Sequence, residues 1–184
     1  MRIISGKYKG HRLAAISAGI RPSSNRLRKT LFDVLGDFVD GSVWLEPFAG
    51  SGAIGLEALS RYASYVIWND KNSEAISLIR KNASICRIQR DYEIHRMPVF
   101  TFLKKLQVKR LDCVFLDPPY DFGKYQKLLK IVSLLPGVLS STKIILEASK
   151  RKKFRISKSG LTVIRSLNVG DSQLMFFSIE NAST

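Results

Sequence analysis

The chain has 184 residues, of which 45% are hydrophobic, and this suits one globular domain with a single sizeable core. Its charge is far less ordinary, because 30 lysines and arginines outnumber 15 acidic residues and leave a formal net charge of +15. Such a surplus indicates a polyanionic partner that is bound through its phosphates. No apolar stretch approaches the length of a membrane span and no secretory signal opens the chain, so we expect a cytoplasmic protein without a membrane partner.

The first 23 residues are basic, and no acidic residue precedes Asp33. Ile3 and Ile4, the glycines Gly6 and Gly10, and the apolar residues 13–16 fit two short strands around a turn. We therefore expect residues 1–23 to form a basic β-hairpin extension that protrudes from a main domain of residues 24–184.

The main domain opens with a helical pattern over residues 25–38, which Ser24 is placed to cap. Strand patterns then follow near residues 43–48, 65–69, 92–95, 113–117 and 143–147, and they alternate with helical patterns near 53–61, 73–86, 99–106 and 124–135. This alternation predicts a Rossmann-like α/β fold with a doubly wound, mostly parallel sheet. Residues 161–167 and 173–179 follow with no helix between them, so we expect a C-terminal antiparallel strand pair.

A glycine-rich turn follows the first expected strand of the main domain. Gly50, Gly52 and Gly55 allow a ligand to approach the backbone closely, and the next helix directs free N–H groups toward the turn. Asp70 ends the next strand, about 20 positions on, where an acid accepts hydrogen bonds from ribose hydroxyls. The alternative is an α/β turn that binds no nucleotide, but the acid together with the glycines favours a ligand site.

A second motif, Asp117-Pro118-Pro119-Tyr120, ends the apolar run of residues 113–116. Consecutive prolines stop the strand and hold the preceding residue extended, which makes a stiff rim with a carboxylate, free carbonyls and an aromatic ring. This set suits a planar amino group on a nucleobase, with Asp117 and the Pro118 carbonyl accepting its hydrogens and Tyr120 stacking on the ring. By itself the motif is equally compatible with an ordinary strand-to-loop turn.

The glycine spacing also matches the dinucleotide pattern, so a nicotinamide enzyme is a competing interpretation. The chain is short for a separate substrate domain, however, and a dehydrogenase has no evident use for the Asp117 motif. A P-loop is excluded because no Gly-Lys-Ser/Thr ending is present. S-adenosylmethionine fits better, since it needs a ribose acceptor and a glycine turn but no pyrophosphate site.

These motifs together carry a family resemblance. Residues 46–52, Asp70 and residues 117–120 resemble a class I S-adenosylmethionine-dependent methyltransferase. Residues 2–10, 21–32 and 170–174 are similar to segments of the ribosomal RNA small subunit methyltransferase D family, so the resemblance runs nearly end to end. It implies methyl transfer to a guanine N2 amine of 16S ribosomal RNA, free or in a small-subunit assembly particle, by an enzyme that we expect to be a monomer.

The motifs, the resemblance and the distribution of basic residues together assign roles to three sets of residues. The catalytic set is Asp117, Pro118, Pro119 and Tyr120, and the cofactor-binding set is Glu46, Phe48, Gly50, Gly52, Asp70 and Met97. The set expected to contact RNA is Arg2, Lys7, Lys9, Arg12, Arg21, Arg26 and Arg28. The chain departs from the family at Glu46, where Asp is usual, at Lys29, where Glu is usual, and at Met97, which replaces an Asp that reads the adenine amine. We therefore expect adenine to be held by backbone and apolar contacts.

Two other functions remain open at this point. An adenine-N6 methyltransferase acting on DNA or RNA would use the same Asp-Pro-Pro-Tyr rim, and a non-catalytic RNA-binding protein would retain the same scaffold. Metal chemistry is not expected, since Cys86, Cys113, His11 and His95 show no ligand spacing. Both cysteines lie in apolar contexts, which predicts buried, reduced thiols.

Overall fold

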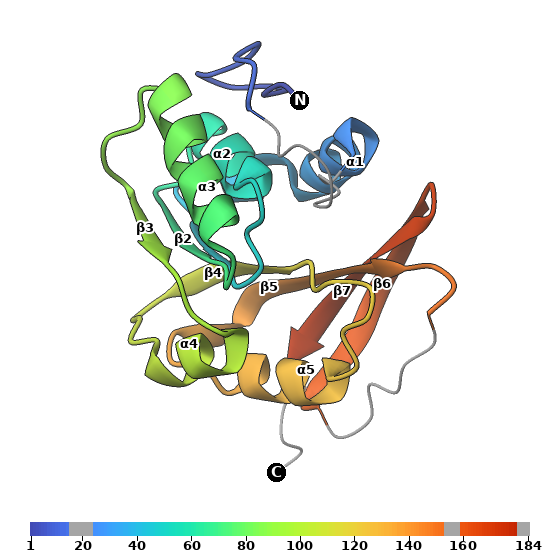
Figure 1. The fold of residues 1–184 in the computed structure, drawn as a ribbon. Helices are drawn as coiled ribbons and strands as arrows, with labels where there is room; N and C mark the ends of the chain where they lie inside the picture. Colours follow the sequence, from blue (N-terminus) through green and yellow to red (C-terminus); the bar gives the residue numbers. More distant parts are fainter. Residues whose placement is uncertain (15–23, 153–158, 180–184) are drawn as a thin grey trace.

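The computed structural model describes residues 1–14, 24–152 and 159–179, and these form one seven-stranded sheet with helices on both faces (Figure 1). The strands lie in the order β3-β2-β1-β4-β5-β7-β6. Neighbours from β3 to β5 run parallel, while β7 is antiparallel to both β5 and β6. The strands are β1 Val43–Glu46, β2 Tyr65–Asn69, β3 Tyr92–His95, β4 Leu111–Leu116, β5 Val138–Ser149, β6 Leu161–Val169 and β7 Ser172–Ile179.

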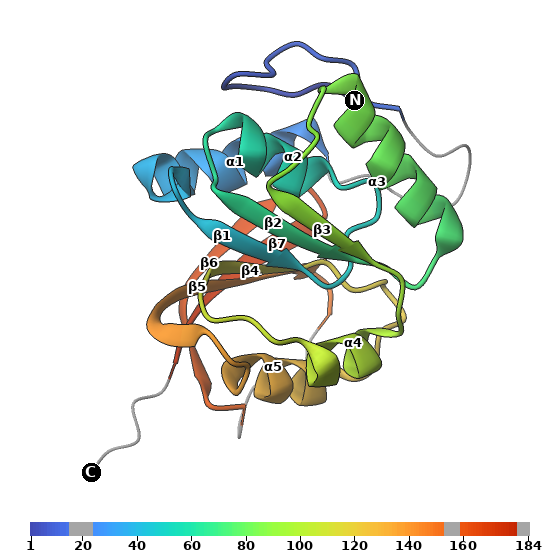
Figure 2. The same ribbon diagram turned by 90° about the vertical axis from the view of Figure 1, so that its left-hand side faces the viewer.

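The helices form two layers, with α1, α2 and α3 over one face of the sheet and α4 and α5 over the other (Figures 1 and 2). Each face has its own apolar core, since one buried cluster gathers side chains of α1 to α3 and the other those of α4 and α5. The helices are α1 Asn25–Leu35, α2 Ala53–Ser60, α3 Ser73–Ile85, α4 Val99–Lys105 and α5 Tyr125–Ser133, and a 3-10 helix spans Gly36–Val39. No helix of the described ranges has the length and apolarity to cross a membrane.

The predicted doubly wound sheet and C-terminal antiparallel pair are confirmed. The Ser24 side chain caps α1 as predicted, accepting from the Leu27 N–H, but the helix ends at Leu35 because Gly36 has a φ of 51°. Strand β5 begins five residues before the expected residue 143, where Val138 pairs with Leu111. Cys86 and Cys113 are buried and free, as their apolar contexts predict.

The predicted N-terminal hairpin is not confirmed. Within residues 1–14 a single antiparallel bridge joins Arg2 and Arg12, without strands on either side. Ile3 and Leu13 belong to the core on the α1–α3 face, so the inner edge of this segment packs into the main body. Residues 15–16 of the expected second strand lie outside the described residues, and the division into two domains stays a prediction.

Candidate active site

The carboxyl ends of three adjacent strands open onto one cavity of about 950 Å³. Phe48 and Gly50 follow β1, Asp70 follows β2, and Asp117 follows β4, and all four line this cavity. Because β4 pairs directly with β1, the glycine turn and the Asp-Pro-Pro-Tyr rim meet although 67 positions separate Gly50 from Asp117. Open α/β sheets bind ligands at this edge, where the strand order reverses.

Asp70 shapes the glycine turn through both carboxylate oxygens. Its Oδ2 accepts a hydrogen bond from the Gly50 N–H at 2.9 Å, and its Oδ1 accepts one from the Asn72 N–H at 2.9 Å. Gly50 and Gly52 have φ values of 52° and 72°, a backbone conformation that residues other than glycine rarely adopt. Each carboxylate oxygen retains a further acceptor site, so the same group is able to hold the turn and accept from a ligand hydroxyl.

Glu46 lines the cavity and is only 2% exposed. Its Oε1 accepts a hydrogen bond from Trp68 Nε1 at 3.0 Å. Burial raises the pKa of this carboxyl to about 8, although the Trp68 N–H and the Gly55 backbone oppose the shift. Gly55 packs so tightly here that a Cβ at its position would meet Glu46 Oε1 and lie 2.6 Å from Trp68 Nε1.

Asn69 is a site residue that the sequence analysis missed. Its buried side chain donates from Nδ2 to the carbonyls of Pro47 at 3.0 Å and Met97 at 3.1 Å, and its Oδ1 accepts from the Met97 N–H at 3.1 Å. Asn69 therefore ties the turn after β1 to the loop after β3. The signal in the sequence was a polar residue at the end of an otherwise apolar strand, directly before Asp70.

Aromatic rings form one wall of the cavity, and only Phe48 among them was predicted. The Phe122 ring lies 5.4 Å from that of Phe48 and 6.1 Å from that of Phe100, centroid to centroid, and Tyr125 packs edge-on against Phe122 at 5.5 Å. Tyr120 stands at the rim and is 52% exposed, whereas Pro118 is buried. The cavity thus has an apolar wall, a carboxylate rim at Asp117 and a glycine turn held by Asp70.

Sequence comparison decides the family. The model described as Conserved hypothetical protein 95 matches residues 1–178. A ribosomal RNA small subunit methyltransferase D from Haemophilus influenzae is 30% identical over 173 residues, which cover 92% of this chain and 89% of the relative. The chain belongs to the ribosomal RNA small subunit methyltransferase D family.

Solved structures agree with this methyltransferase D assignment at the level of the fold. A hypothetical protein from Thermus thermophilus is 28% identical with a TM-score of 0.82, over 97% of this chain and 99% of that one. An RNA methyltransferase from Salinibacter ruber, solved in complex with S-adenosyl-L-homocysteine, has a TM-score of 0.69 at 14% identity, over 89% and 97% of the two chains. The second match shows a common architecture alone.

The basic residues expected to contact RNA fall into separate places in this methyltransferase D family member. Arg26, in the first turn of α1, lines the cavity and is exposed. A second group is exposed on residues 1–14, and it consists of Arg2, Lys7, Lys9 and Arg12. Arg21 lies outside the described residues.

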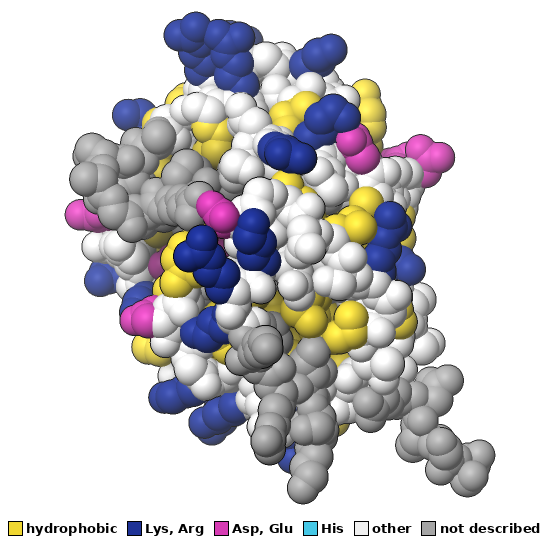
Figure 3. All heavy atoms as spheres, turned by 90° about the vertical axis from the view of Figure 1, so that its right-hand side faces the viewer, with side chains coloured by type: hydrophobic (Ala, Val, Ile, Leu, Met, Phe, Trp, Pro, Cys, Tyr) yellow, Lys and Arg dark blue, Asp and Glu magenta, His cyan; other side chains and the backbone are white. Residues whose placement is uncertain are grey.

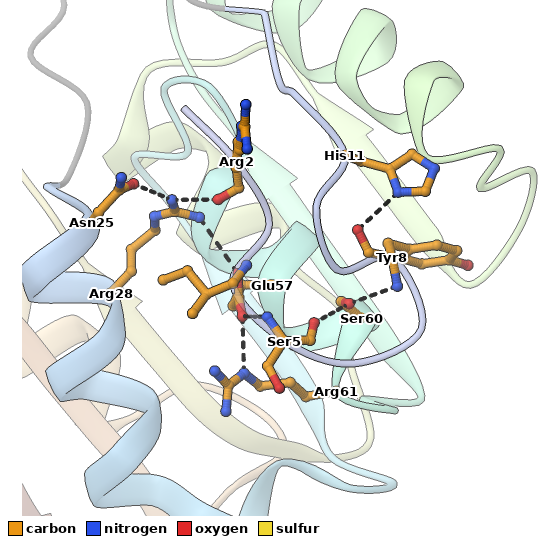
Figure 4. A network of polar contacts seen from close by, with 10 residues as sticks. Arg2, Ser5, Tyr8, His11, Asn25, Arg28, Glu57, Ser60 and Arg61 are labelled. Carbon is orange, nitrogen blue, oxygen red and sulfur yellow. Dashed lines mark hydrogen bonds and ion pairs between the residues drawn. The ribbon is translucent and has the colours of Figure 1, made fainter.

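The prediction that Arg28 contacts RNA is wrong, because its side chain is fully buried and not available to RNA phosphates. Its guanidinium donates to the Arg2 carbonyl and to Asn25 Oδ1, each at 2.7 Å, and lies 3.5 Å from the Glu57 carboxylate (Figure 4). Glu57 also accepts from the N–H groups of Ile4 at 2.8 Å and Ser5 at 3.0 Å. A buried carboxylate needs such partners, so Arg28 serves to anchor residues 1–14 on α2.

The structure also locates two segments that carry the family resemblance, residues 170–172 and the part of α1 that contains Lys29. Residues 170–172, in the turn after β6 and at the start of β7, line the cavity together with Glu147, whose Oε1 accepts from the Ser172 hydroxyl at 2.9 Å. The sequence analysis gave these residues no site role. Lys29 stands where the family usually has Glu. Its side chain points to solvent and pairs with Asp33 at 2.6 Å, so position 29 offers no carboxylate to the site.

Proposed function

We propose that this methyltransferase D family member transfers a methyl group from S-adenosylmethionine to the N2 amine of a guanine in 16S ribosomal RNA. The observation that carries the proposal is the shared cavity, which places the Gly50 turn and the Asp117 rim around one space. The RNA is either free or part of a small-subunit assembly particle, and the enzyme acts on it in the cytoplasm as a monomer.

The residues around the cavity fit S-adenosylmethionine. Asp70 retains acceptor capacity for ribose hydroxyls, and the positive φ values of Gly50 and Gly52 leave the backbone open to the methionine portion. Glu46 is the acid that would orient the ammonium group. The Met97 N–H already donates to Asn69, but the Met97 carbonyl keeps a second acceptor site, so adenine recognition falls to this carbonyl and to apolar contacts with Met97 and the Phe48 wall. When bound, the cofactor supplies an electrophilic methyl group on a sulfonium.

The Asp117 rim acts on the guanine amine. An exocyclic amine is a poor nucleophile because its lone pair is delocalised into the ring. Asp117 and the Pro118 carbonyl accept hydrogen bonds from the two amine hydrogens, which lets the nitrogen direct its lone pair at the methyl group, while Tyr120 stacks on the base. Asp117 also takes the proton that the amine loses on methylation. Extruding the base from its stack costs roughly a few kcal/mol. Good alignment of the reacting groups contributes about 7–11 kcal/mol in the most favourable cases.

The first test replaces Asp117 with Asn, which keeps the shape of the side chain but removes its charge. We expect methyl transfer to fall by about 100-fold or more, by analogy with loss of one charge-stabilising group, while S-adenosylhomocysteine binding measured by calorimetry stays within about twofold. Asp121→Asn is the matched control, because Asp121 is an exposed acid on the same loop. Retained turnover in Asp117→Asn would exclude the proposed catalytic role.

The second test identifies the acceptor base. Small subunits and free 16S RNA from cells that lack the protein are incubated with labelled cofactor, and the product nucleoside is identified by mass spectrometry. N2-methylguanosine at a single position is the expected product. N6-methyladenosine would show the adenine alternative instead, and incorporation into duplex DNA but not RNA would overturn the proposed substrate.

A further inference from the structure

Lys152 joins the end of β5 to the loop that follows the Asp-Pro-Pro-Tyr rim. Its Nζ donates to the Tyr120 carbonyl at 2.7 Å and lies 3.4 Å from the Phe122 carbonyl. The same Nζ stands 5.1 Å from the ring centroid of Tyr125, at the start of α5. One ammonium group therefore contacts three residues of the segment that carries the rim, from a position about 30 residues later in the chain.

This loop needs an anchor, because residues 120–124 all line the cavity and most of them are exposed. Within the loop, the Phe122 N–H donates to the Pro119 carbonyl at 2.8 Å, which closes a turn. Phe122 in turn packs against Phe48 across the cavity wall, with 5.4 Å between centroids. The position of the turn thus fixes both the Tyr120 ring at the rim and the Phe122 ring in the wall.

We propose that Lys152 is a positioning residue, which holds the loop of residues 120–124 so that Tyr120 stacks correctly on the target base. This inference rests on the proposed function for its effect on turnover, although the contacts themselves do not. A general RNA contact is the alternative role, since residues 150–155 form a basic run. Against that role, two of the three N–H donors of the Lys152 ammonium already go to carbonyls and its Nζ lies 5.1 Å from the Tyr125 ring centroid, so at most one donor is left for an RNA phosphate.

The experiment compares three variants: Lys152→Ala, Lys152→Arg and Arg151→Ala. Arg151 is the exposed neighbour of Lys152, so its alanine variant removes the same charge from the same run. We expect Lys152→Ala to lower kcat by roughly tenfold or more, since a misplacement of about 1 Å costs up to about 100-fold. Its KM for RNA should change no more than in Arg151→Ala, and Lys152→Arg, which keeps donors for both carbonyls, should recover most of kcat.

A second readout is independent of activity. Hydrogen exchange should accelerate at the amides of residues 121–124 in Lys152→Ala, but not in Arg151→Ala, because only the first substitution releases the loop. The inference is overturned if the two alanine variants show equal kcat, equal RNA affinity and equal exchange in this loop. If the unmodified protein transfers no methyl group to RNA, the proposed function fails, while the exchange measurement still decides whether Lys152 holds the loop.

Discussion

At the scale of single residues, the site depends on where a carboxyl group lies as much as on its identity. Glu46 is buried beneath the glycine turn, and burial raises its pKa to about 8, so the acid is mostly protonated at pH 7. Asp70, one strand away, is only partly buried and accepts two backbone hydrogen bonds. An ammonium group beside Glu46, as we propose for the bound cofactor, would favour the carboxylate, so cofactor binding and loss of this proton would be linked.

The raised pKa of Glu46 predicts a pH dependence of stability. The folded protein keeps this proton between pH 4.5 and about 8, where the unfolded chain has released it. The free energy of unfolding should therefore fall as the pH rises through this window, by an amount on the order of a few kcal/mol. Glu46→Gln should remove that fall in denaturant titrations at pH 5 and pH 8.5. The exposed Glu74→Gln control should keep it, and identical pH profiles for both variants would contradict the assignment.

At the scale of elements, α2 is fully enclosed, since all eight of its residues are buried, and its first turn lines the cavity through Ala53 and Ile54. The sequence predicts a helical pattern over residues 53–61, and segments packed on every side of α2 bury its polar side chains as well as its apolar ones. One side packs on β1 and β2 through Gly55, and another holds residues 1–14 through Glu57 and Ser60. Ser60 Oγ accepts from the Tyr8 N–H at 3.0 Å, next to the Glu57 network (Figure 4).

Gly55→Ala tests this close packing. The added methyl group would meet Glu46, Trp68 and Val66, so we expect a loss of about 1–3 kcal/mol in the free energy of unfolding, together with weaker cofactor binding. Gly123→Ala is the control, because no atom lies within 4 Å of the position its Cβ would take. The control should change stability by less than about 0.5 kcal/mol. Equal stability of Gly55→Ala and the unmodified protein would show that α2 has room to move.

At the scale of the whole molecule, positive charge exceeds negative charge by 15. Figure 3 shows lysine and arginine side chains scattered over one face, with fewer acidic side chains among them. Residues 1–14 carry one exposed group of these cations on the α2 side, while α4 and α5 carry others on the opposite layer (Figure 1). Only cations that meet RNA phosphates contribute to affinity through counterion release.

Salt dependence separates the two groups of cations. The triple variant Lys7→Ala, Lys9→Ala, Arg12→Ala should weaken RNA binding and reduce the slope of log affinity against log salt by about 2. The control is Lys104→Ala, Lys105→Ala, Lys130→Ala on α4 and α5, which removes the same charge from the other layer and should leave the slope nearly unchanged. Equal slopes for the two triple variants would exclude residues 1–14 as an RNA contact.

The sequence by itself determined the order and type of nearly every element, the glycine turn and the Asp117 rim. These features depend on local rules: hydrophobic period, caps such as Ser24, the φ values open to glycine, and the missing N–H of proline. Boundaries were less accurate, since β5 begins at Val138 through pairing with Leu111, which no local pattern encodes.

Only the tertiary structure decided which distant groups meet. The pairing of β4 with β1 brought Asp117 and Gly50 to one cavity, and the packing of α1 on α2 turned Arg28 from a surface cation into a buried partner of Glu57. Burial likewise set the protonation of Glu46, and the end of β5 delivered Lys152 to the Tyr120 loop. Hydrogen-bond partners, desolvation and pKa depend on residues far apart in the chain, so the composition of a short segment does not specify them.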